Sequence, residues 1–217
     1  MIKKYLSVLT AVSLSLIAVT GAYSNAAEKE VTEVTTKRSE YRKVFNNGDG
    51  TYTAYTNTAP IHFLDNGEWT EIDNTLVDNG DGFYTNKNNS FSVSLPSELN
   101  IADAESSAVN LSYEKLNISC ALTNIEIPSG FESQPAYIDV NNAVYDSAYD
   151  MNIPEGLAAA FSNASAEADY RSISDGLDLN MSVHNSTFTE SLVINDVDKI
   201  PESVTYSVSA EGVQLER

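Results

Sequence analysis

Apolar and polar residues alternate along most of this chain in short runs, which is the spacing that half-buried β-strands require. The clearest run places four apolar side chains on one face: Leu177, Leu179, Met181 and Val183. A turn at 184–186 follows, and the stripe resumes with Phe188, Leu192 and Ile194, where Glu190 is an inward or edge charge. Other alternating sets are Phe91, Val93 and Leu95; Val109, Leu111 and Tyr113; and Val204, Tyr206 and Val208. This pattern predicts an all-β fold, an antiparallel sandwich or open barrel-like sheets built from hairpins.

Turn residues separate these runs where hairpins need them. Asp49-Gly50 lies between two β-prone segments, and Asp65-Asn66-Gly67 and Asp81-Gly82 repeat the arrangement. Asp-Gly and Asn-Gly pairs supply the positive φ angles of tight hairpin turns. We therefore expect chain reversals at these three places.

Helix-forming composition is confined to one segment. Residues 155–168 are rich in alanine and follow Pro154, but they hold serine and asparagine in their middle. At most one short helix is expected there. Residues 27–40 are charged and threonine-rich without an apolar period, which predicts a flexible leader ahead of a β-rich module over 41–217. The strand pattern reaches Arg217, so the module is expected to be incomplete at its C-terminus.

The first 26 residues have the pattern of a cleaved signal peptide. Lys3 and Lys4 precede an apolar run over 6–19, and Ser24-Asn25-Ala26 offers small residues for the peptidase. The apolar run is short for a membrane span of about 30 Å. We expect a mature chain that begins near Ala27 or Glu28 and is secreted or held at the cell surface.

Charge narrows the set of partners. The chain has 12 Lys and Arg against 31 Asp and Glu, a net charge of −19, which becomes −21 once Lys3 and Lys4 are removed with the leader. Such a surface repels phosphate backbones and anionic lipids. We therefore expect no nucleic-acid partner and no membrane contact after signal cleavage. A single cysteine, Cys120, excludes an internal disulfide, and its place in an alternating run predicts a buried, unreactive thiol.

Two blocks of sequence resemble a known family. The first carries a Gly-Asp-Gly turn, then Ala59-Pro60-Ile61-His62-Phe63 and Trp69-Thr70-Glu71-Ile72-Asp73-Asn74-Thr75-Leu76; the second runs from Asp169 through Gly176-Leu177-Asp178-Leu179 to Ile194. They resemble the N-terminal β module of secreted bacterial surface proteins with RHS/YD repeats or DNRLRE-type domains. The resemblance implies a β-rich module on a longer protein, whose partners are its own downstream domains. It brings no catalytic residue with it.

Residue types that could carry chemistry do not form a motif. The Asp/Asn/Gly turns lack EF-hand spacing, because positions three and five counted from Asp78 are Gly80 and Gly82. His62 and His184 belong to no HxH or HExxH pattern. Acid pairs are uninformative among so many carboxylates. We expect no metal, no cofactor and no catalytic residue.

The sequence therefore favours a non-catalytic structural module of an exported cell-surface or shell-forming protein. One alternative is a carbohydrate-binding module that stacks exposed aromatic residues on a cell-wall or plant polysaccharide; its candidates are Tyr52, Tyr55, Trp69, Phe83 and Tyr84. A second alternative is the accessory domain of a secreted hydrolase. Trp69 shares its strand face with Glu71, which also fits a half-buried sheet anchor.

Overall fold

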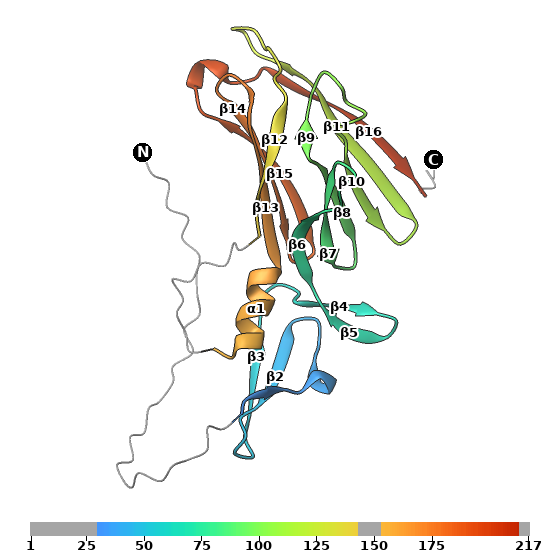
Figure 1. Ribbon diagram of the computed structural model, residues 1–217, viewed down its shortest axis with the longest axis vertical. Helices are drawn as coiled ribbons and strands as arrows, with labels where there is room; N and C mark the ends of the chain where they lie inside the picture. The colour runs from blue at the N-terminus through green and yellow to red at the C-terminus, as the bar shows by residue number, and fades with distance from the viewer. Residues whose placement is uncertain (1–29, 143–152, 213–217) are drawn as a thin grey trace, which may run out of the picture.

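The computed structural model describes residues 30–142 and 153–212, which form two packed sheets with smaller sheets at one end (Figure 1). The pairings between described strands are antiparallel, and one short helix accompanies them. The all-β sandwich expected from the alternation is confirmed. The predicted signal peptide, 1–26, lies outside the described residues, as does the last stretch, 213–217.

One sheet of the sandwich has six strands in the spatial order β16–β11–β10–β8–β7–β6. In chain order they are β6 (Asp73–Asp78), β7 (Phe83–Asn88), β8 (Ser92–Pro96), β10 (Val109–Tyr113), β11 (Leu116–Glu126) and β16 (Ser203–Glu211). Strands β6, β7 and β8 follow one another as hairpins. Strand β16 comes from the end of the described chain and pairs along β11, with a register shift between Leu122 and Asn124.

The other sheet has five strands in the order β15–β14–β13–β12–β9. They are β9 (Glu98–Leu99), β12 (Ala136–Asn141), β13 (Ser165–Ser174), β14 (Leu177–His184) and β15 (Thr187–Ile194). The chain passes from one sheet to the other at Ser97, between β8 and β9. A single 3₁₀ turn, η2 (Val197–Lys199), leads from β15 to β16.

The core lies between the two sheets and uses the stripes that the alternation predicts. Leu177, Leu179, Met181 and Val183 of β14 are all buried. Tyr170 of β13 is also fully buried, and its hydroxyl donates to the carbonyl oxygen of Pro96 at 2.6 Å. Each large apolar side chain buried here contributes about 1.5–3 kcal/mol to folding. The sandwich is therefore the main source of stability.

A small sheet lies beyond one end of the sandwich (Figure 1). It consists of β1 (Thr32–Glu33), β2 (Arg42–Asn46) and β3 (Tyr52–Thr56), with the 3₁₀ turn η1 (Thr35–Lys37) between β1 and β2. The hairpin of β4 (His62–Asp65) and β5 (Glu68–Glu71) follows. Part of the predicted flexible leader is thus ordered. Strand β1 pairs with β2, and the carboxylate of Glu33 is bound by two cations, which fixes a segment that has no apolar period.

The three predicted chain reversals occur as expected. Asp49-Gly50 lies between β2 and β3, Asn66-Gly67 between β4 and β5, and Asp81-Gly82 between β6 and β7. Gly50 has a φ of +86°, which an L side chain rarely adopts. The carboxylate of Asp81 accepts the main-chain N–H of Phe83, so the acids of these turns serve local hydrogen bonding.

The helix is shorter than the segment with helical composition. Helix α1 spans Glu155–Asn163 and buries Leu157 and Ala160. It ends there because the following residues have a period of two, and Ala166, Ala168 and Tyr170 of β13 all face the core. In Figure 1, α1 lies between the sandwich and the small N-terminal sheet.

One set of apolar positions is more exposed than the alternation predicts. Val204, Tyr206 and Val208 of β16 are 38%, 39% and 62% exposed, although they share the inner face of the sheet with buried neighbours on β11. Cys120 pairs with Val208 and is half-buried rather than buried for the same reason. At this edge the five-stranded sheet covers the six-stranded sheet only in part, through contacts such as that of the Tyr206 hydroxyl with the Glu190 carboxylate of β15.

Within the described residues, no helix has the length and apolar character needed to cross a membrane.

Candidate functional site

The aromatic residues considered for sugar binding do not form one platform. Tyr52 and Tyr55 both lie on β3, but an odd spacing of three puts them on opposite faces of the strand. Tyr52 is 63% exposed, whereas the ring of Tyr55 meets Phe45 edge-on at a centroid distance of 5.7 Å. Tyr84 packs against the sandwich core.

Trp69 and Phe83 lie on two different sheets. Trp69 is half-buried on β5 opposite Leu64, and its carbonyl oxygen lies 3.4 Å from a guanidinium nitrogen of Arg38. Phe83 begins β7 in the six-stranded sheet. Trp69 is half-buried on a strand, and its role as a sheet anchor stays a prediction. The structure therefore spreads the aromatic set over three sheets and does not converge it on a cleft.

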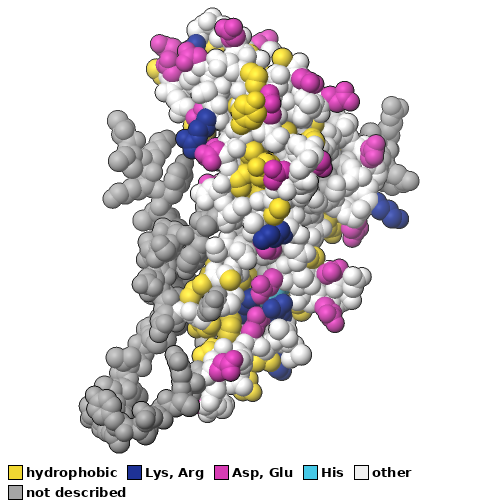
Figure 2. All heavy atoms as spheres, in the orientation of Figure 1, with side chains coloured by type: hydrophobic (Ala, Val, Ile, Leu, Met, Phe, Trp, Pro, Cys, Tyr) yellow, Lys and Arg dark blue, Asp and Glu magenta, His cyan; other side chains and the backbone are white. Residues whose placement is uncertain are grey.

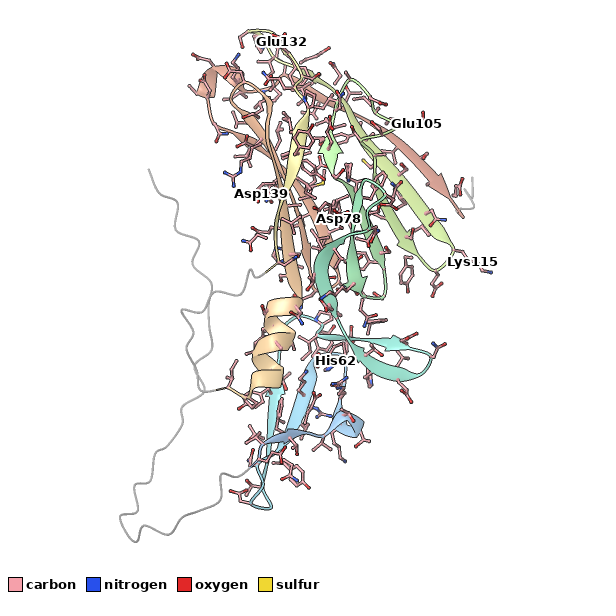
Figure 3. All side chains as sticks on the ribbon, viewed as in Figure 1. His62, Asp78, Glu105, Lys115, Glu132 and Asp139 are labelled. Carbon is pink, nitrogen blue, oxygen red and sulfur yellow. The ribbon has the colours of Figure 1, made fainter. Side chains whose placement is uncertain are left out.

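A different group of residues does converge, at the junction between the small sheet, the β4–β5 hairpin and α1. We call it the junction cluster: Glu33, Arg38, Lys43, His62 and Glu71. Figure 3 shows His62 at this junction, well away from the labelled acids of the sandwich. The cluster brings side chains of the small sheet and its η1 turn together with side chains of the β4–β5 hairpin, although these segments are separated in sequence.

Lys43 is the centre of the junction cluster. Its side chain is 1% exposed, yet its ammonium has three acceptors, one for each proton. It donates to Glu33 at 3.2 Å, to the carboxylate of Glu71, and to the carbonyl oxygen of Gly156 in α1 at 3.0 Å. Lys43 therefore joins three elements: the small sheet, the hairpin and the helix.

Arg38 binds the same two carboxylates from the other side. Its Nε and Nη2 donate to the two oxygens of Glu33 at 2.7 and 3.0 Å, a bidentate pair. Nη2 also lies 3.2 Å from Glu71. Two carboxylates and two cations thus balance within the cluster, which limits the cost of burying them.

His62 completes the cluster and is neutral. Its side chain is 1% exposed, and Nδ1 donates to the carbonyl oxygen of Ser39 at 2.8 Å, which leaves Nε2 as a bare acceptor. Nε2 has no hydrogen-bond partner among the described residues. Burial lowers the pKa of His62; the Ser39 hydrogen bond opposes this, while the charges of Arg38 and Lys43 reinforce it.

The charged members of the cluster respond to burial and to each other. Burial raises the pKa of Glu33, but the hydrogen bonds and charges of Arg38 and Lys43 outweigh that effect, and the net pKa is lowered. Burial lowers the pKa of Lys43, and the nearby Glu33 carboxylate partly offsets this. The carboxylate is therefore held in its charged form by its neighbours.

Glu33, His62 and Glu71 bring three potential metal ligands within 4.8 Å of one another. A dication there would meet the ammonium of Lys43 and the guanidinium of Arg38, which already bind both carboxylates. Nearby positive charges oppose metal binding by several kcal/mol in a partly buried site. The arrangement therefore fits an ion-pair network within the chain better than a metal centre.

A second buried polar side chain, that of Asn74, forms hydrogen bonds at the same junction. Asn74 of β6 is fully buried, and its Nδ2 donates to the carbonyl oxygens of Ala164 at 2.8 Å and Asn185 at 2.9 Å. Its Oδ1 accepts Asn89 at 2.8 Å. Asn185, in the β14–β15 turn, donates in turn to the carbonyl oxygen of Pro60 at 2.6 Å. We call these contacts the amide network.

Sequence reasoning missed the junction cluster because its members lie in no motif. Glu33 falls in the predicted leader, and the sequence around Glu71 relates it only to Trp69 on the same strand face. One signal was available: Lys43 alternates with the buried Phe45 on the inner face of β2. A lysine on an apolar face indicates a buried ion pair, since an unpaired buried charge is costly.

Charged side chains elsewhere are dispersed. Figure 2 shows acidic residues scattered among uncharged ones over this face of the molecule. Comparison of the chain with models of protein families, with characterised proteins and with solved structures gives no match. The resemblance to the N-terminal modules of bacterial surface proteins therefore rests on the two sequence blocks alone and remains an expectation.

Proposed function

We propose that this chain is a non-catalytic structural module of an exported bacterial cell-surface protein. It would act as a rigid two-part body that holds the domains joined to it in a defined orientation. The observation that carries this proposal is the buried polar junction, in which Lys43 and Asn74 join the small sheet, the hairpin, the helix and the sandwich.

A polar junction suits this role because hydrogen bonds are directional and apolar contacts are not. Lys43 has all its protons bound, and Asn74 uses both amide protons on main-chain carbonyls. Each bond holds only at one distance and angle, so a tilt of the small sheet breaks several at once. The junction thus favours one orientation of the two parts.

The placement of the aromatic residues favours this reading over sugar binding. A carbohydrate platform needs exposed rings that face the same way, whereas Tyr84 packs against the core and Tyr55 packs on Phe45. Tyr52 is the one strongly exposed member of the set, and a lone ring is a weak sugar site. These rings mainly serve packing.

A binding and activity panel tests the proposal on the secreted chain. Insoluble cell-wall and plant polysaccharides are mixed with the protein, with Tyr52→Ala as the matched variant, and soluble products are measured in parallel. We expect equal, non-saturable retention of both proteins and no product. Saturable binding that Tyr52→Ala abolishes would favour the sugar-binding module. Turnover lost through one Asp or Glu substitution would favour the hydrolase accessory domain.

Export is tested separately. Intact-mass measurement of secreted material should give a chain that starts near Ala27 or Glu28, because the pattern of residues 1–26 is that of a cleaved leader. A secreted species that retains Met1 contradicts the predicted cleavage of the leader and leaves the structural part of the proposal standing.

A further inference from the structure

Strand β16 is the longest of the edge strands in the two sandwich sheets, as far as the structure describes them. It runs for nine residues, Ser203–Glu211, and pairs with β11 on one side only (Figure 1). Among the described residues, no strand pairs with its other side. Its free side therefore carries a row of unpaired main-chain donors and acceptors, which is a template for another strand.

The other three edge strands of the two sandwich sheets, as far as the structure describes them, are protected. On β6, the side chain of Asn142 acts as a substitute strand: Oδ1 accepts Leu76 N–H at 2.7 Å, and Nδ2 donates to the Leu76 carbonyl at 3.0 Å. On β15, Glu190 points inward beside Met181. Strand β9 has only two residues. Capping, an inward charge and short length are devices that prevent pairing.

Strand β16 has none of these devices. Its sequence from Ser203 to Ala210 contains no charged residue and no proline, in a chain that carries 31 acids. Its inner face is apolar and only partly covered: Val208 is 62% exposed, whereas the hydroxyl of Tyr206 donates to the carboxylate of Glu190 on β15. An apolar groove of about 300 Å³ lies between the sheets at the neighbouring strands β10 and β11 and at β15, lined by Phe91, Leu111, Leu116, Ile118 and Phe188 among others. An uncharged edge strand with a partly exposed apolar face favours pairing with another strand.

We propose that the occupant of this edge is β16 of a second copy of the chain, paired antiparallel about a twofold axis at Ser207. This register uses all nine residues. On the inner face it sets Val204 opposite Ala210 and Tyr206 opposite Val208, so the two apolar faces continue into one another. The two six-stranded sheets then form one sheet across the dimer.

Charge selects a second copy over other strands of this acidic chain. The central seven residues of β16 carry no carboxylate, whereas Glu202, just before the strand, approaches Glu211 of the other copy only at the margins. Like charges at the margins weaken the dimer at low ionic strength, and salt screens them over about 8–10 Å. The dimer is therefore strengthened by added salt, the opposite of one held by ion pairs.

Sedimentation velocity over a concentration series tests the interface. The wild-type chain should convert from monomer to dimer as concentration rises, and more readily at high salt. Val208→Lys places a charge on the inner face of the edge and should raise the dissociation constant at least about tenfold. Val77→Lys, the same change on the opposite edge strand of that sheet, should leave it unchanged. A monomer at every concentration, or equal loss in both variants, overturns the proposal.

Cysteine cross-linking tests the register in a Cys120→Ser background. At the twofold axis, Ser207→Cys places two sulfurs opposite one another, within the Cα separation of about 4.4–6.8 Å that a disulfide needs. Thr205→Cys lies on the same outer face, but its copies are four residues apart along the strands, about 13 Å. Mild oxidation should link Ser207→Cys into dimers and leave Thr205→Cys monomeric. The reverse result, or no link in either, contradicts this register.

The outcome is independent of the structural role proposed above. A chain that remains monomeric in both experiments still has its junction cluster and amide network, whereas a chain that binds polysaccharide through Tyr52 can still pair through β16. Far-UV circular dichroism of each variant confirms that it folds, so loss of the dimer is read as loss of the interface.

Discussion

The side-chain amide of Asn74 donates a hydrogen bond to the main-chain carbonyl oxygen of Asn185 at 2.9 Å, across 111 positions of sequence. Asn74 belongs to the six-stranded sheet, and Asn185 belongs to a turn of the five-stranded sheet. The same amide binds Ala164 at the end of α1. A single buried side chain therefore holds β6, the end of α1 and the β14–β15 turn together. Its removal should destabilise all three contacts at once.

Asn74→Ala should lower the free energy of unfolding by about 3 kcal/mol, because it leaves buried carbonyl oxygens without their donor. Urea denaturation measures the loss. Asn195→Ala is the matched control, since its amide also binds a neighbour, Asp178, but at an exposed site. The control should change stability by less than about 0.5 kcal/mol. An equal loss of stability in the two variants would mean that the amide network stabilises the fold no more than an exposed hydrogen bond does.

Lys43→Met should lower the free energy of unfolding more than the same substitution at an exposed lysine. It leaves the Glu33 and Glu71 carboxylates with one cation, and it removes the donor to Gly156. Breaking a buried pair costs about 3–5 kcal/mol, and we expect about 2–3 kcal/mol here because Glu71 is partly exposed.

Lys87→Met is the control for that prediction, since Lys87 pairs with Asp73 at 3.7 Å and is half-exposed. An exposed pair contributes about 0–1 kcal/mol. Thermal or urea unfolding of both variants decides the matter, and a Lys43→Met protein as stable as Lys87→Met contradicts the role given to the junction cluster.

His62 should make the fold less stable on mild acidification. Its pKa is lowered in the fold by burial, so below its ordinary value of about 6.5 the unfolded chain binds a proton that the folded chain does not. The contribution of His62 to the free energy of unfolding therefore drops as pH falls below about 6.5, before the Glu33 effect begins below about 4.5; the raised pKa of Glu190 acts in the opposite direction and is common to wild type and variant. His62→Gln should flatten the first part of this profile and keep the second. A variant with the wild-type slope between these pH values argues against His62 as its source.

Two glycines should respond in opposite directions. Gly50→Val should cost about 1 kcal/mol or more, because its φ of +86° strains a β-branched residue even though nothing lies within 4 Å of the new Cβ. Gly156→Ala, inside α1, meets only a ring carbon of Phe45 at 3.9 Å and should gain about 0.5–1 kcal/mol. Melting temperatures of the two variants should move apart. Loss in both would indicate that the helix is not formed as described.

The sandwich could be predicted from sequence because its signals are local. The stripe from Leu177 to Val183 and the turn at Asp81-Gly82 each depend on neighbouring residues, so the alternation and the turn chemistry identify them directly. The junction cluster could not, since Glu33 and Lys43 meet Glu71 only after the chain has folded back twice. The exposed inner face of β16 was missed for a related reason: alternation identifies a face and does not tell what covers it.

The most direct test of the rigid two-part body follows unfolding with two probes. Trp69, the one tryptophan of the sequence, reports on the hairpin beside the junction, and far-UV circular dichroism reports mainly on the sandwich. If the buried junction joins the two parts, both signals should change in one coincident urea transition, and Lys43→Met should shift both midpoints together. Separate transitions, with the Trp69 signal lost while the sandwich remains folded, would show that the small sheet and the hairpin are held only loosely and would contradict the structural role proposed here.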